Sequence, residues 1–141
     1  MGASTFIGEH GAAAVKLAAQ TAAVEQTVAR LSGSPTRAQL AQLTPAASQA
    51  RSELARAGEW HVAGAGEEGA EEEDVPRAET QVTEGASELA GAIAALQRYA
   101  RAPSATLLAG YKSKLANGRT EWNEGIAQLW YLGHRSKSPT L

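Results

Sequence analysis

Residues 82–115 read VTEGASELAGAIAALQRYARAPSATLLAGYKSKL, and this stretch decides the fold. Apolar side chains recur every three or four positions on both sides of a short break, which is the period of an amphipathic α-helix. The break consists of Ala102-Pro103-Ser104, and a connection this short makes two successive helices antiparallel neighbours. The stretch therefore predicts a helical hairpin.

The same apolar spacing continues outward from the hairpin and divides the chain into four segments. The seam of the second segment, for example, runs through Leu40, Leu43, Ala47, Ala50, Leu54, Ala57 and His61. Spacing of this kind over three heptads favours near-parallel helices around one core. We therefore predict an all-α protein, an antiparallel up-down-up-down four-helix bundle.

The length of 141 residues suits one domain, which we predict over residues 1–135. The predicted helices span about 4–32, 35–62, 76–101 and 104–134. An acidic loop rich in Gly and Glu, residues 62–76, joins the second helix to the third, and this composition is typical of a solvated linker. Asp74 is the expected cap of a helix that begins near Pro76. Residues 136–141 are predicted to form a disordered tail.

The sequence predicts where the second helix starts, but it leaves open whether the helix is continuous through Pro45. Ser34 is the predicted N-cap, with Pro35 in the first helical position. Pro45 lacks a backbone donor and disfavours helical geometry at the residue before it. Two alternatives stay open: one continuous helix, or a break or kink at Pro45 with Thr44 as the cap of the main helix.

Composition and charge exclude several classes of function. Alanine accounts for 31 of the 141 residues and has the highest intrinsic helix propensity. The same excess is typical of a GC-rich coding sequence and points to a bacterial source. The net charge is −2, the pI is about 5.9 and no basic stripe occurs, so a nucleic-acid partner is not expected. The chain has no cysteine, which excludes disulfides, thiolate catalysis and iron–sulfur clusters.

No stretch approaches the roughly 20 apolar residues of a membrane-spanning helix. The first ten residues, MGASTFIGEH, lack the basic and apolar regions of a signal peptide. We expect a soluble protein with two compartments open: the cytoplasm, or an extracytoplasmic location for a domain whose signal or anchor has been removed.

Polar seam residues gather at one end of the predicted bundle. His10, His61 and Glu79 each lie 21 residues from the end where their helix meets a short connection, or about 31 Å at 1.5 Å per residue. Bundles build metal sites from imidazoles and carboxylates that face inward from different helices. The three residues are therefore a candidate site for a divalent transition metal.

Three further polar residues, Glu9, Glu59 and His134, lie at a similar level. They could supply more ligands or accept hydrogen bonds from the ligating imidazoles. The competing interpretation is that a seam histidine near a helix end is a half-buried, hydrogen-bonded residue. Neither Glu-x-x-His nor His-Glu-x-x-His spacing occurs in the chain, which favours that interpretation.

Aromatic residues fall near the same end. Trp60, Trp130 and Tyr131 form a predicted amphipathic patch for a partner or a small ligand, because such residues anchor interfaces. The alternative is a cluster that seals the end of the bundle. Trp122 falls on the seam and is predicted to fill the core.

No catalytic motif emerges from the sequence. The serines stand in no nucleophile elbow, and Gly64, Gly66 and Gly69 stand among glutamates that would repel a phosphate. We expect a non-enzymatic helical module for partner binding, sensing or a structural role, with a protein partner or self-association. Two alternatives stay open: a metal- or cofactor-binding bundle built on the candidate metal residues, and a small-ligand sensor with an aromatic end pocket.

Overall fold

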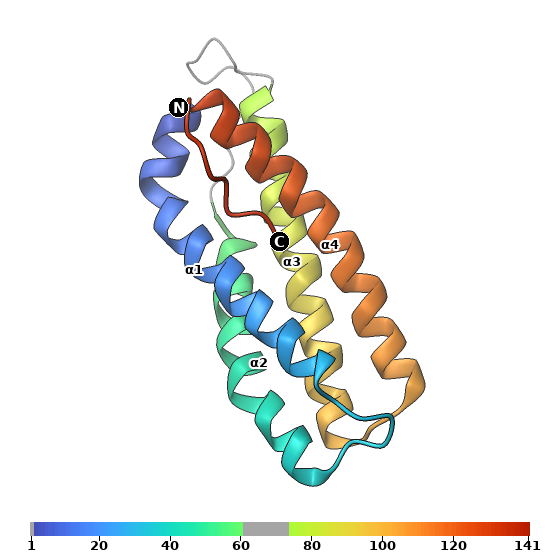
Figure 1. Ribbon diagram of the computed structural model, residues 1–141. Helices are drawn as coiled ribbons and strands as arrows, with labels where there is room; N and C mark the ends of the chain where they lie inside the picture. The colour runs from blue at the N-terminus through green and yellow to red at the C-terminus, as the bar shows by residue number, and fades with distance from the viewer. Residues whose placement is uncertain (1, 61–73) are drawn as a thin grey trace.

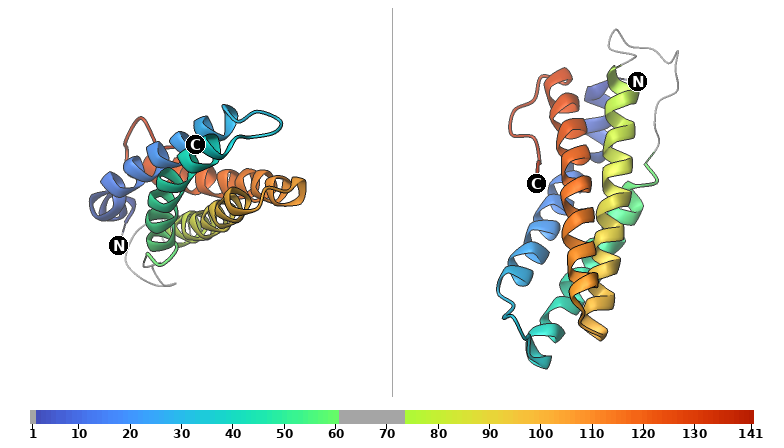
Figure 2. Two further views of the ribbon diagram at one scale, coloured as in Figure 1. Left: turned by 90° about the horizontal axis from the view of Figure 1, so that it is seen from below. Right: turned by 90° about the vertical axis from the view of Figure 1, so that its right-hand side faces the viewer.

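The computed structural model describes residues 2–60 and 74–141. Within these residues the chain forms four helices, α1 (Ala3–Ala29), α2 (Arg37–Ala57), α3 (Asp74–Arg101) and α4 (Ala105–Leu132). Each helix packs against the next along the chain, and α1 also contacts α4. Figures 1 and 2 show the helices running alternately in opposite directions along one long axis. The predicted antiparallel up-down four-helix bundle is confirmed.

The helix limits differ from the predicted ones by a few residues. The second helix ends at Ala57 rather than at residue 62, and the third already includes Asp74 in its first turn. Most of the predicted acidic loop, residues 62–73, lies outside the described residues.

The start of α2 requires a correction. Thr36, not Ser34, is the N-cap, and its hydroxyl accepts a hydrogen bond from the backbone N–H of Gln39 at 3.1 Å. The side chain of Gln39 in turn accepts one from the backbone N–H of Thr36 at 2.9 Å. This reciprocal capping box satisfies two backbone donors at once, whereas a serine cap before Pro35 would satisfy one.

Pro45 does not interrupt α2, which continues from Arg37 to Ala57. The proline is exposed, and its neighbours along the helix, Leu43 and Ala47, are each 1 % exposed. Both flanking turns are therefore fixed by burial against the core, which offsets the lost backbone hydrogen bond. Of the two alternatives, the structure has the continuous helix.

Helices α3 and α4 approach each other closely because glycines face the contact. A Cβ on Gly85 would stand 2.6 Å from the backbone nitrogen of Trp122, and one on Gly125 would stand 2.6 Å from the carbonyl oxygen of Ala78. Real Cβ atoms do not come this near to backbone atoms. The absence of a side chain at these positions therefore sets the distance between the two helices.

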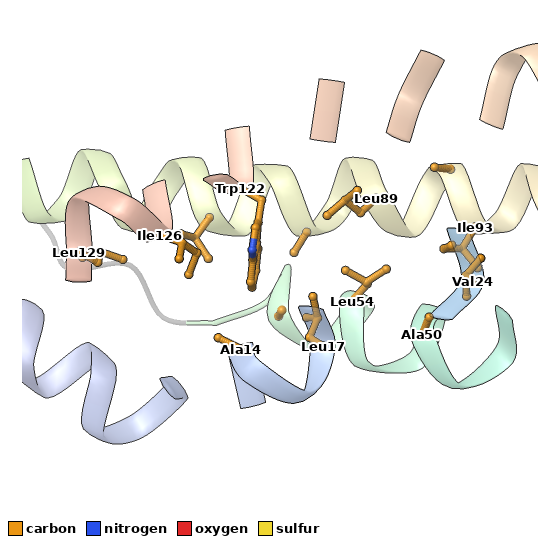
Figure 3. Close-up of a cluster of buried hydrophobic side chains, with 14 of the residues drawn as sticks. Ala14, Leu17, Val24, Ala50, Leu54, Leu89, Ile93, Trp122, Ile126 and Leu129 are labelled. Carbon is orange, nitrogen blue, oxygen red and sulfur yellow. The ribbon is translucent and has the colours of Figure 1, made fainter. Parts of the chain in front are cut away.

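The core lies along the axis between the four helices. Figure 3 shows Trp122 and Ile126 of α4 facing the same interior space as Leu89 of α3, Leu54 of α2 and Leu17 of α1. All five side chains are at most 1 % exposed. Burial of this apolar surface is the main favourable contribution to folding.

The C-terminal residues require a second correction. Residues 136–141 were expected to be disordered, but they turn back and run between α1 and α4 (Figure 1). Leu141 packs against the core, and Asn123 bonds to its backbone. Apolar burial and hydrogen bonding together offset the conformational entropy lost on ordering the segment.

No helix in the described part of the chain is long and apolar enough to cross a membrane.

Candidate functional site

An aromatic cluster closes the end of the bundle where α1 begins and α2 ends. The imidazole of His10 is stacked on the indole of Trp60, with ring centroids 4.3 Å apart and 16° between the planes. Phe6 meets both rings edge-on, at 5.0 Å from His10 and 5.8 Å from Trp60. On its other side, Trp60 lies 6.4 Å from Trp122 of the core. Trp60 thus connects the residues that follow α2 with the core.

The environment of His10 favours its neutral form. Its side chain is 18 % exposed, and a carboxylate oxygen of Glu9 lies 3.8 Å from its Nε2, where it would pair with the protonated imidazole. Burial lowers the pKa of the imidazole below its usual 6.5, and the negative charge of Glu9 opposes this shift in part. Desolvation exceeds the ion pair because the carboxylate is half exposed and screened by water.

The three residues of the candidate metal site differ in their surroundings. His10 is engaged in the stack, Glu79 is buried in α3 at 1 % exposure, and His61 lies outside the described residues. In the ranges 2–60 and 74–141, no three His, Asp or Glu side chains are grouped so that they could hold a metal ion. Glu59 and His134 are both exposed.

The three residues of the predicted aromatic patch differ in exposure. Trp60 is half-buried in the end cluster, and Trp130 is 5 % exposed and lies against Gly11 of α1. Tyr131, by contrast, is 76 % exposed. Two of the three are therefore packed into the bundle, and the tyrosine alone is open to solvent.

Side chains of α4 form hydrogen bonds with backbone atoms of the C-terminal segment, residues 134–141. These bonds attach the segment to the helix. The indole Nε1 of Trp122 donates to the carbonyl oxygen of Pro139 at 3.0 Å. The amide of Asn123 donates to the backbone oxygen of Leu141 at 3.0 Å and accepts from the Leu141 N–H at 2.7 Å. A single amide side chain thus satisfies both backbone groups of one residue.

The turn that starts the C-terminal segment is a Schellman motif. The N–H of His134 donates to the carbonyl of Tyr131, and the N–H of Arg135 donates to the carbonyl of Trp130. His134 has φ 55° and occupies the left-handed position that usually holds glycine. Lys137 has φ 58° and turns the chain a second time.

This arrangement is not among the features predicted from the sequence, although part of the signal for it is present there. Asn123 stands in the middle of a helix beside a predicted core tryptophan, and asparagine is a weak helix former that competes for backbone hydrogen bonds. An asparagine in that position is expected to have a hydrogen-bond partner. The partner lies 18 positions away and cannot be inferred from periodicity.

A hollow of about 490 Å³ lies between α1 and α4 at the end of the bundle opposite the aromatic cluster. Tyr99 and Tyr111 contribute to its wall. The Tyr111 hydroxyl is buried and has no hydrogen-bond partner among the described residues. Burial raises the pKa of Tyr111 to about 12, because a phenolate would lose its hydration there.

Comparison of the chain with protein-family models, with curated proteins and with solved structures finds no match.

Proposed function

We propose that this chain is a non-enzymatic helical module that binds a protein partner. The observation that carries the proposal is the reciprocal pair of hydrogen bonds between Asn123 and the backbone of Leu141. An amide that pairs with both the N–H and the backbone oxygen of one residue recognises main-chain groups whatever side chain that residue carries. Main-chain hydrogen bonds of this kind give affinity in peptide recognition, and neighbouring pockets give specificity.

The surroundings of Asn123 support a preformed site. Its neighbour Trp122 is 0 % exposed, and the indole contributes a third hydrogen bond to the same segment. Both residues belong to α4, which glycine contacts hold tightly against α3. Side chains on a rigid helix lose little entropy when a ligand arrives, which favours binding.

Two exposed apolar side chains are suited to an interface. Tyr131 and Val15 are the large apolar residues that stay exposed in the described part of the chain, at 76 % and 56 %. Tyrosine is enriched at protein interfaces because it offers a large contact area with few rotatable bonds.

The test is a selection from a displayed library of random octapeptides against the variant S138G/P139G/T140G/L141G, which weakens the hold of the chain's own segment on Asn123, and against the same variant with Asn123→Ala added. We expect enriched peptides to bind the first at least about tenfold better than the second, because a lost backbone contact costs about 1.4 kcal/mol. Asn117→Ala, at an exposed asparagine on the same helix, is the matched control and should not change binding. Failure of any peptide to prefer the chain with Asn123 over the chain with Asn123→Ala would contradict the proposal.

A further inference from the structure

The contacts of the C-terminal segment define which chemical features of a peptide the site on α4 recognises. Trp122 and Asn123 bond only to backbone atoms of Pro139 and Leu141. The Thr140 N–H donates to the Ser138 carbonyl at 2.8 Å, which closes a three-residue turn centred on Pro139. A proline fits such a turn because its ring fixes φ near −65°.

Three of the last four side chains, those of Ser138, Pro139 and Leu141, are half-buried. Leu141 is half-buried and packs against the core, and Pro139 is half-buried as well. Thr140, between them, is exposed. The two apolar residues among them, Pro139 and Leu141, are separated by one exposed residue, which gives the pattern Pro-x-Leu.

The backbone that connects the end of α4 to the bound part of the segment is sterically strained. Two non-glycine residues, His134 and Lys137, adopt positive φ on the way from the end of α4. The left-handed conformation is sterically unfavourable for residues with a Cβ. A peptide supplied by another molecule would make the same hydrogen bonds without these two turns.

We propose that the surface formed by Trp122, Asn123 and the core beneath Leu141 is a binding site for a Pro-x-Leu segment of a protein partner. The chain's own residues 134–141 are then an intramolecular competitor for that site. The inference rests on the proposed partner-binding function and names the class of peptide. A tethered segment has an effective concentration in the millimolar range. A partner therefore has to outcompete the segment at that concentration in order to occupy the site.

A second copy of the chain is a less suitable occupant than a partner. Exchange of the segment between two copies would form the contacts that already exist within one copy. The gain is limited to relief of the turns at His134 and Lys137, while two molecules lose translational and rotational freedom. This balance of a small gain against a loss of freedom favours a partner that brings additional contacts of its own.

The test uses a fluorescent peptide with the sequence of residues 134–141, HRSKSPTL, titrated with full-length chains and followed by anisotropy. The wild type should bind it weakly, because its own segment competes. The variant S138G/P139G/T140G/L141G, in which the competitor is weakened, should bind about tenfold more tightly. Adding Asn123→Ala to this variant should reverse the gain, and adding Asn117→Ala should not. A peptide with Pro and Leu replaced by Gly should not bind.

Three outcomes would overturn the inference. They are absence of binding to the weakened-competitor variant at millimolar concentration, equal binding with and without Asn123→Ala, and concentration-dependent dimerisation of the wild type that the variant lacks. The last would assign the site to a second copy. Asn123→Asp, which keeps the acceptor and loses the donor, provides the same comparison if the alanine variant does not fold. If HRSKSPTL fails while library-selected peptides bind through Asn123, the Pro-x-Leu pattern is wrong and the partner-binding function stands.

Discussion

The imidazole of His10 lies nearly parallel to the indole of Trp60, at a centroid distance of 4.3 Å. The pair ties the first third of α1 to the residues that follow α2, and Trp60 in turn meets Trp122 of the core. An aromatic contact of this kind contributes about 0.5–1.5 kcal/mol beyond the burial of its area. The end of the bundle is thereby closed by neighbouring aromatic rings from three parts of the chain.

Stability should decrease as the pH falls below about 6.5, because burial lowers the pKa of His10 in the folded state. Between the folded and the unfolded pKa, the unfolded chain binds more protons, so a falling pH favours unfolding. We expect His10→Phe, which keeps a stacked ring and removes the titration, to flatten this dependence. Urea denaturation between about pH 5 and 8 would measure it. Superimposable profiles for the two proteins would contradict the assignment to His10.

The buried face of α2 could be predicted from sequence because it depends on helical periodicity alone. Its buried residues, Leu43, Ala47, Ala50, Leu54 and Ala57, all belong to the predicted seam. The predicted seam of the third segment runs through Val82, Ala86, Leu89, Ile93, Leu96 and Ala100. Helix α3 buries a wider face than this seam, including Tyr99 and Val75, because it packs against both α2 and α4. Local spacing identifies one face of a helix, but the number of neighbours depends on the whole arrangement.

The course of the C-terminal segment could not be predicted, because its cause is not local. Its turns occur at His134 and Lys137, where glycine would be the expected residue. Its attachment depends on Asn123 and on the surface near Trp122. Polar composition near a chain end indicates disorder in general, and tertiary hydrogen bonds override that tendency here.

Replacing His134 by glycine should stabilise the protein by roughly 0.5–1 kcal/mol. Glycine adopts the left-handed C′ conformation without the steric cost that a Cβ introduces. The free energy of unfolding in urea would measure the gain. Ser136→Gly, outside the positive-φ positions, is the control and should give no gain. An equal effect at both positions would show that φ at residue 134 is not the cause.

Tyr111→Phe should leave stability unchanged or raise it by about 1 kcal/mol. The hydroxyl of Tyr111 is buried without a hydrogen-bond partner in the described residues, and removing such a group recovers its desolvation cost. Tyr99→Phe is the comparison, since Tyr99 belongs to the same hollow and its hydroxyl is not among the buried groups that lack a partner. A loss of more than about 1 kcal/mol for Tyr111→Phe would mean that the hydroxyl is hydrogen-bonded in solution.

Two glycine-to-alanine variants of α4 should change stability in opposite directions. At Gly125 a Cβ would stand 2.6 Å from the carbonyl oxygen of Ala78 and 2.8 Å from Cγ2 of Val82. Helices α3 and α4 must then separate, which costs roughly 1–3 kcal/mol because nearby core contacts are lost. At Gly110 nothing lies within 4 Å of the added Cβ, so the alanine should gain up to about 1 kcal/mol of helix propensity.

Thermal unfolding of the two variants and the wild type measures this difference. A change of 1 kcal/mol corresponds to a shift of about 2–4 °C for a domain of this size. Gly125→Ala should therefore melt several degrees below the wild type, and Gly110→Ala slightly above it. Because both substitutions add the same methyl group to the same helix, intrinsic propensity cancels in the comparison. Equal melting temperatures would mean that α3 and α4 are not packed through Gly125 in solution.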